Sequence, residues 1–310
     1  MSRYIAARLL AVLPVLLVVS VLAFSLQALA PGDPARLLLE ASGLNPPPPE
    51  AIAAKRAELR LDDPLPVRYA GWLADALRGD LGRSYRSYQP VSKLYLERLP
   101  ATLTLAVLAV TLSAAVAVPL GAIAAYQRGK PLDGVAQILA VTGAAIPGFW
   151  ISLVFMFIFA AKLRWLPAFG SLTPKGIIMP AVVLALTHSA IITRLTRAAT
   201  LDVLGQEFVS VARAKGLSGW TIARRHVLPN VLVPVLTVLG LELAGLITGA
   251  AVVEYVFAWP GIGKMAVDAA LLRDTPVIVG FAVAAGVIFV LVNLMVDLIV
   301  AAIDPRARKI

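Results

Sequence analysis

Long apolar stretches with few or no charges constrain the fold of this chain more than any other feature. A helix that crosses the ~30 Å hydrocarbon layer of a membrane needs about 20 apolar residues. Six stretches able to supply such a helix run through the sequence, at residues 9–30, 99–127, 134–161, 176–193, 227–256 and 275–296. A membrane-spanning helix satisfies its backbone hydrogen bonds internally, so this pattern predicts an all-α integral membrane protein with six transmembrane helices.

Composition supports the membrane class and excludes several kinds of chemistry. Hydrophobic residues make up 59% of the chain and charged residues only 15%, whereas about a quarter of the residues of a soluble domain are charged. The chain has no cysteine, which excludes disulfides, cysteine-ligated zinc and thiol catalysis. The net charge of +10 is compatible with nucleic acid binding. The hydropathy and the placement of the charges instead favour membrane lipid as the partner and argue against nucleic acid.

The distribution of Lys and Arg predicts the orientation, because short loops rich in these residues stay in the cytoplasm. Both ends of the chain and the segments 128–133 and 194–226 together hold thirteen basic and four acidic residues. Residues 31–98 hold ten basic and nine acidic residues. We therefore expect both termini to be cytoplasmic and 31–98 to lie outside. The first apolar run is longer than the core of a secretory signal, which favours an uncleaved first span.

The spans divide the chain into three parts. Residues 1–30 hold the N-terminal segment and the first span, residues 31–98 form an extracytoplasmic cap, and residues 99–310 form a five-span core. Within the cap, short helices are predicted at 50–61 and 66–78, the second with Tyr69 and Trp72 at helical spacing. The cap either covers the ends of the spans or forms part of a docking surface for an external partner.

The cytoplasmic loop at 194–229 is too long to be a tight turn. Residues 206–215 read as a short helix, with Phe208, Val211 and Ala212 near one face. Gly216 stands where a left-handed helix cap is needed, and Ser218 can start a second helix that leads into the fifth span. The loop therefore predicts a helix–Gly–helix element, which either holds anionic lipid headgroups or docks a soluble partner.

Two features of this loop resemble the signature of ATP-binding-cassette importer permeases. The first is the run Ala212-Arg213-Ala214-Lys215-Gly216, and the second is His226-Val227-Leu228-Pro229. The Ala-Arg-Ala-Lys-Gly form is similar to that of the peptide and nickel subfamily. The chain departs from the general signature, which has Glu and Ala where Ser210 and Val211 stand and Ile where His226 stands.

Further fragments resemble the first, B-type subunit of dipeptide and oligopeptide permeases in the same order along the chain. They are Pro31-Gly32-Asp33-Pro34, Gly79-Asp80-Leu81-Gly82, Arg98-Leu99-Pro100-Ala101-Thr102, Glu254-Tyr255-Val256-Phe257 and Pro260-Gly261-Ile262-Gly263. This resemblance implies the type I importer permease fold in a bacterial plasma membrane. It also implies four kinds of partner. These are a second homologous permease, two ATP-binding-cassette ATPase subunits, an extracytoplasmic solute-binding protein and membrane lipid.

The resemblance also implies how the chain obtains energy. No Gly-x-x-x-x-Gly-Lys-Ser/Thr loop occurs in the sequence, so we expect no cofactor on this chain and ATP with Mg²⁺ on the partner subunits. The ATPase-coupling residues are then Ala212, Arg213, Ala214, Lys215 and Gly216. The function implied is a non-catalytic permease subunit that forms half of the path for di- or oligopeptides, with nickel or another small solute as the alternative.

Ionisable residues inside the spans are candidates for the translocation path or its gate, because an unpaired charge in a membrane is costly. These candidates are Glu242, Glu254 and Asp297. His188 and Arg194 are expected in the inner half of the fourth span, and an Asp297–Arg194 ion pair is the structural alternative. Gly245 and Gly249 form a small-residue pair that is expected to allow close helix packing. Pro119 and Pro147 are candidates for helix kinks.

Two other function classes were weighed. An intramembrane serine protease would need a Ser–His pair, but His188 and Ser189 are neighbours on one helix and point about 100° apart. A self-sufficient secondary transporter or channel could be built from six spans as an oligomer. The long helix–Gly–helix loop and the resemblance both favour an importer permease over these two classes.

Overall fold

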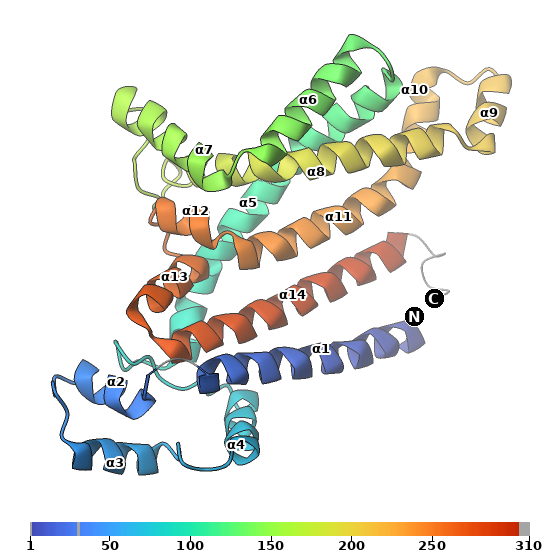
Figure 1. The fold of residues 1–310 in the computed structure, drawn as a ribbon. Coiled ribbons are helices and arrows are strands. Elements are labelled where there is room, and N and C mark those ends of the chain that lie inside the picture. Colours follow the sequence, from blue (N-terminus) through green and yellow to red (C-terminus); the bar gives the residue numbers. More distant parts are fainter. Residues whose placement is uncertain (1, 30–31, 304–310) are drawn as a thin grey trace.

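The computed structural model describes residues 2–29 and 32–303, which fold into helices joined by turns (Figure 1). Ala30, Pro31 and the charged residues 304–309, which enter the sequence argument above, lie outside the described residues. The elements are α1 Ser2–Leu29, α2 Pro34–Ala41, α3 Pro49–Glu58, α4 Leu65–Leu77, α5 Val91–Tyr126, α6 Pro131–Ala145, α7 Gly148–Phe155, the π-helix η1 Met156–Lys162, α8 Ile178–Leu204, α9 Glu207–Ala214, α10 Gly219–Ile222, the π-helix η2 Ala223–Val227, α11 Leu228–Gly249, α12 Ala251–Val256, α13 Ile262–Leu272 and α14 Thr275–Ile303.

Within this described part, five helical segments are long and apolar enough to cross a membrane. They are Leu10–Leu29, Val91–Tyr126, Ile178–Leu204, Gly219–Gly249 and Thr275–Ile303. The segments Pro131–Gly143 and Gly148–Lys162 pass the same test only as a pair and are bent by 93°. The predicted third span at 134–161 is therefore broken at the candidate kink Pro147, and six spans result when the bent pair is counted as one. Pro147 stands at the break, where it lacks an N–H to continue the helix.

The spanning helices lie side by side as a slanted layer in which α8, α11, α14 and α1 follow one another (Figure 1). Helix α5 crosses this layer and makes its most extensive contact with α8. Two glycines allow close approach. A Cβ at Gly121 of α5 would collide with the backbone of α8 at Thr193, and one at Gly240 of α11 would collide with Val296 of α14. Small residues let helix backbones pack tightly in a membrane.

The cap, made of α2, α3 and α4, packs on the adjacent end of α1 through aromatic side chains. The ring of Tyr69 meets that of Phe24 edge-on at 5.4 Å, and Trp72 stacks on Tyr69 at 6.3 Å. The hydroxyls of Tyr69 and Ser20 are 2.8 Å apart. The helix predicted at 66–78 is thus present as α4, and its aromatic face covers the end of a span.

Asp274, just before α14, links the segment between α4 and α5 to the helical core by hydrogen bonds. Its carboxylate accepts hydrogen bonds from the Ser84 hydroxyl at 2.5 Å and from the Tyr85 amide at 3.0 Å. Tyr95 of α5 donates to the Val277 carbonyl of α14 at 2.8 Å. Burial, reinforced by the negative charge of Asp274, raises the pKa of Tyr85 to about 12. The phenol therefore stays neutral beside the carboxylate.

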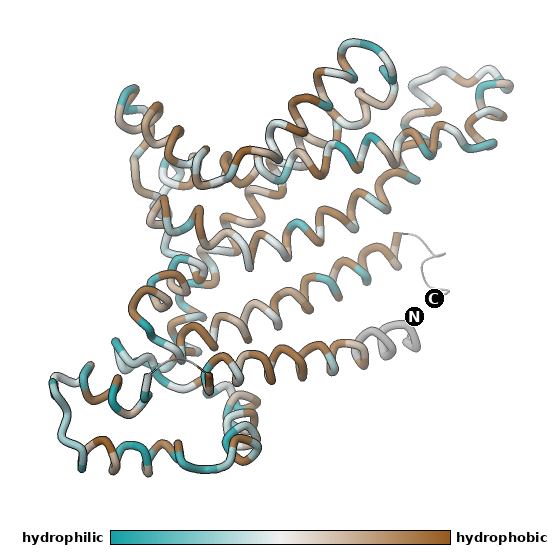
Figure 2. The backbone as a smooth tube through the Cα atoms, viewed as in Figure 1, coloured by the Kyte–Doolittle hydropathy of each residue, from teal (hydrophilic) through white to brown (hydrophobic). Residues whose placement is uncertain are grey.

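The two ends of the layer are more hydrophilic than the long helices between them, as Figure 2 shows. The long helices are apolar along most of their length, whereas the cap helices and the α9 turn carry hydrophilic residues. Both α1 and α14 have their cap-distal ends on the side where α9 and α10 lie (Figure 1). The molecule therefore has a cap end and an α9–α10 end, and the candidate site residues divide between them.

Candidate functional site

The α9–α10 end has the helix–Gly–helix geometry that the sequence predicts. Helix α9 runs over Glu207–Ala214, and Gly216 follows with a φ of +76°. That backbone conformation is open to glycine and strained for most other residues. The Ser218 side chain then accepts a hydrogen bond from the Thr221 amide and caps α10. Helices α10, η2 and α11 continue as one run, Gly219–Gly249, which is long and apolar enough to span a membrane.

A small apolar cluster fixes this element to the rest of the molecule. Val209 and Ala212 of α9 are buried against Ile222, Val227 and Val231 of the following helices. Residues of α5, α8 and α11 pack around this cluster, namely Val118, Ala199, Val203, Leu204 and Leu239. Because its side chains interlock with three spanning helices, the element cannot tilt without moving them.

The apolar residues of α9 divide between its two sides. Phe208 and Val211 are 42% and 52% exposed, because the helix turns Val209 and Ala212 towards the core. Trp220 on α10 is 76% exposed, and the predicted coupling residues Arg213, Ala214, Lys215 and Gly216 are exposed as well. The outer surface of the element thus combines large apolar side chains with two cations. This combination is common at protein docking surfaces.

An ion pair that the sequence analysis missed joins α6 to α8 near the same end. Arg197 of α8 donates two hydrogen bonds to Asp133 of α6, at 2.6 and 2.7 Å. Asp133 is 3% exposed and also accepts from the Gly129 amide and the Gln137 amide group. Paired bonds between Arg and a carboxylate fix orientation as well as distance. An Arg on an apolar helix was a signal that such a partner exists, but the sequence does not identify which acid it is.

Glu242 of α11 is paired with His188 of α8. The Nδ1 atom of His188 and the carboxylate Oε2 of Glu242 are in hydrogen-bond contact. The two side chains are 26% and 13% exposed. His188 lies in the half of α8 that begins at Ile178, because the helix continues to Leu204 at its other end. The structure therefore brings a predicted path residue together with a histidine that the sequence analysis treated separately.

Glu254 occupies a different environment at the cap end. It lies on α12 and is fully buried. Its carboxylate accepts from the Thr102 hydroxyl at 2.6 Å and from the Lys264 amide at 2.9 Å. The Thr102 hydroxyl also accepts from the Ile262 amide at 2.9 Å. The carboxylate thus joins α5, α12 and the start of α13.

Asp297 lies in α14, near the end that adjoins Ile303. This end of α14 is distant from α12, which holds Glu254, both in the sequence and across the layer of helices (Figure 1). Its ion pair with Arg194 stays a prediction. The three acidic candidates for the path therefore do not form one cluster.

The expected packing role of Gly245 and Gly249 is not found inside this chain. A Cβ at either position would have no neighbouring atom within 4 Å among the described residues. The two glycines lie on the same side of α11 as Glu242, because they follow it by three and seven positions. The two glycines therefore leave open space beside Glu242, although Leu246, four positions after Glu242, is buried.

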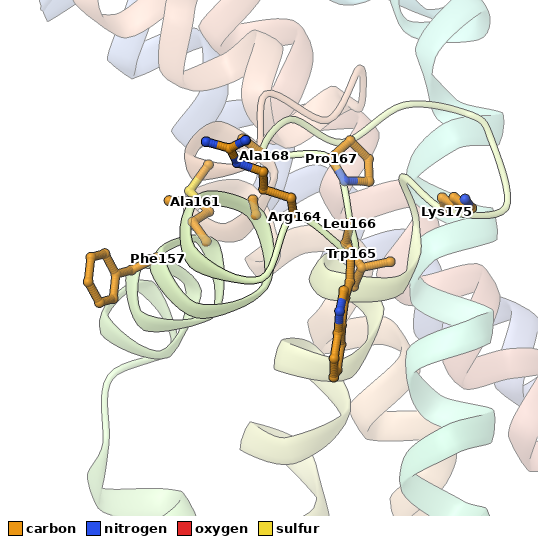
Figure 3. Close-up of a pocket in the computed structure, with 10 residues that line it drawn as sticks. Phe157, Ala161, Arg164, Trp165, Leu166, Pro167, Ala168 and Lys175 are labelled. Carbon is orange, nitrogen blue, oxygen red and sulfur yellow. The ribbon is translucent and has the colours of Figure 1, made fainter.

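A separate hollow of about 680 Å³ lies between η1 and the loop at 163–175 (Figure 3). Its lining is mostly apolar. Trp165 and Leu166 lie on the loop, and the ring of Phe157 points away from that loop (Figure 3). The two charged residues in this lining, Arg164 and Lys175, are both cations. None of the residues predicted for the path contributes to this hollow.

Family comparisons agree with this architecture over nearly the whole chain. Residues 117–309 match the family described as binding-protein-dependent transport system inner membrane component. Residues 1–106 match the N-terminal part of such membrane components. The chain belongs to this family of ATP-binding-cassette importer permeases. It is therefore a multi-pass inner-membrane subunit of a transport complex that includes ATPase and binding-protein partners.

Relatives of known name cover the chain from end to end. A peptide transport system permease protein of Brucella abortus (strain 2308) is 39% identical over 316 residues, which is 99% of each chain. The glutathione transport system permease protein GsiC of Salmonella choleraesuis is 38% identical over 310 residues, again 99% of each. Among solved structures, an inward-facing form of the MetNI methionine transporter matches with a TM-score of 0.60 and 18% identity. The match covers 68% of this chain and 96% of the solved chain. At this level of identity it supports only the fold, which is that of type I importer permeases.

Proposed function

We propose that this chain is one of two related permease subunits of an importer that carries short peptides into the cell, driven by two ATPase subunits. Both named relatives are permeases for peptides or for glutathione, itself a peptide. In this proposal both termini and the α9–α10 end face the cytoplasm, in keeping with the basic residues there. ATP with Mg²⁺ binds to the partner subunits, and an extracytoplasmic binding protein delivers the solute at the cap end.

The observation that carries this proposal is the α9–Gly216–α10 element. Its inner side interlocks with spanning helices through Val209 and Ala212. Its outer side presents Trp220, Arg213 and Lys215. An ATPase that moved this surface would move α11 with it, because α10 and α11 belong to one helical run. In this proposal Ala212 anchors the element, while Arg213, Ala214 and Lys215 face the ATPase and Gly216 sets the angle between the two helices.

Gly216→Val tests the proposal. A Cβ at this position meets no atom within 4 Å, but the φ of +76° is strained for a β-branched residue. We expect the change to re-aim α10 and to lower solute uptake about tenfold or more per ATP hydrolysed, or to release the ATPase subunits. Uptake and ATP hydrolysis would be measured in proteoliposomes with the purified complex.

Gly219→Val is the matched control, since Gly219 also has open space around its Cβ position but has no positive φ. Gly216→Asn is a second variant, because Asn tolerates the left-handed region better than Val. We expect both to keep coupling near that of the wild type. Normal uptake and normal ATPase stimulation in Gly216→Val would show that this element does not transmit force.

A further inference from the structure

Glu242 and the open space at Gly245 and Gly249 carry an inference about how the solute is recognised inside the membrane. A carboxylate within a membrane span is costly unless it faces protein or water. Here it has a partner on the next helix, His188, and the pair remains partly exposed at 13% and 26%. The pair therefore lies at the edge of the contact between α8 and α11, where part of each side chain remains accessible.

Glu242 has hydrogen-bonding capacity to spare. An ionised carboxylate can accept about four hydrogen bonds through its two oxygens. Within the described part of the chain, Glu242 makes one side-chain hydrogen bond, through Oε2 to His188. His188 holds the carboxylate in place from one side, and Oε1 is left to accept from a group outside this chain.

Glycine makes room beside this carboxylate. Gly245 and Gly249 continue the same face of α11, and a Cβ at either would meet no atom within 4 Å. Gly240, on the opposite face, packs directly against Val296. The open space at these two glycines therefore lies on the side of α11 that carries the charge, where a backbone without a neighbouring side chain can be approached closely.

We propose that the Glu242 carboxylate, oriented by His188, binds the α-ammonium group of a peptide as the solute passes this level of the membrane. The inference rests on the proposed function, because it takes the solute to be a peptide. Charge complementarity selects this end of the peptide, since an ammonium group donates up to three hydrogen bonds and carries the opposite charge. The glycine face beside it accommodates the first residues of the backbone without contacts to their side chains.

Uptake of two peptides that differ only at the amino terminus tests this inference. One dipeptide has a free amine and the other is N-acetylated, and each is loaded onto the binding protein at a concentration that saturates it. The purified complex in proteoliposomes is then compared with its Glu242→Gln variant. We expect the wild type to prefer the free amine and the variant to lose about tenfold of that preference, since a hydrogen bond between charged groups has been removed.

Two further variants separate positioning from general damage. His188→Gln keeps an amide that can hold the carboxylate and should retain the preference, whereas His188→Leu should lower it. Glu97→Gln removes an exposed carboxylate that pairs with Lys93 within α5, and it should leave the preference unchanged. The total uptake rate is recorded alongside the preference, because a merely structural role would lower uptake of both peptides equally.

The outcomes are distinct. An unchanged preference in Glu242→Gln overturns the inference while leaving peptide import intact. Loss of the second permease from the purified Glu242→Gln complex also overturns it, because the carboxylate would then pair with a cation of that subunit. A wild-type complex that takes up Ni²⁺ but neither peptide in the presence of ATP contradicts the peptide function itself, and with it the inference.

Discussion

Two carboxylates in neighbouring regions of the molecule have opposite environments. Glu254, on α12, is fully buried and accepts hydrogen bonds from a side chain and a backbone amide of two other elements. Glu242, on α11, is partly exposed and is held by one histidine beside an unoccupied glycine face. A carboxylate whose oxygens accept hydrogen bonds from several groups of its own chain stabilises the fold. A carboxylate with unused acceptor capacity beside open space can bind a ligand. The same residue type thus occupies two different environments within one chain.

The largest expected effect concerns the packing around Glu254. A Cβ at Gly261 would collide with both carboxylate oxygens of Glu254. Gly261→Ala is therefore expected to lower the free energy of unfolding by about 3 kcal/mol or more, because the buried network has no space to relax. Gly245→Ala, beside Glu242, meets nothing and is expected to change stability by less than about 1 kcal/mol. Thermal unfolding in detergent measures both, and equal losses would contradict the comparison.

A smaller effect is expected from the hydroxyl that serves Glu254. Thr102→Val keeps the shape of the side chain but removes the donor to Glu254 and the acceptor for the Ile262 amide. Leaving buried polar groups without partners costs about 1–3 kcal/mol. The matched change Thr237→Val on α11 removes a hydroxyl that bonds to the Val233 carbonyl of its own helix, so its loss should be smaller. A thermal shift for Thr102→Val no greater than that for Thr237→Val would show that the network adds little.

The smallest effect on stability is expected from Glu242 itself. Glu242→Gln keeps an oxygen that can accept from His188, and the site is open to solvent or solute, so the free energy of unfolding should change by less than about 1 kcal/mol. Thermal unfolding and the yield of the assembled complex are the measurements. A loss as large as that in Gly261→Ala would place Glu242 with Glu254 as a structural residue.

Local features of the α9–α10 end could be predicted from the sequence because they depend on near neighbours. The left-handed backbone of Gly216 and the cap at Ser218 are consequences of residue types within one or two turns. The buried side of α9 was predicted less well. Which of Phe208, Val209 and Val211 faces inwards depends on where α5, α8 and α11 pack, and that packing has no signal in the short helix itself.

Neither carboxylate environment could be predicted, since each depends on contacts between distant parts of the chain. Thr102 and Glu254 are 152 positions apart, and His188 and Glu242 are 54 positions apart. Both acids stood out in the sequence for the same reason, their place in or beside an apolar run. The sequence predicted that Pro147 was a candidate kink, but the angle of 93° there depends on how α6 and α7 pack.

The amino-acid sequence by itself determined that the chain is helical and membrane-embedded, how its spans are ordered, and that one polar loop forms a glycine-jointed pair of helices. These properties depend on hydropathy and on local backbone preferences, which act over a few residues. Only the tertiary structure decided which acid is closed into a network and which is left open beside glycine. That distinction depends on the free energy of burying a charge, which is determined by partners that folding brings together.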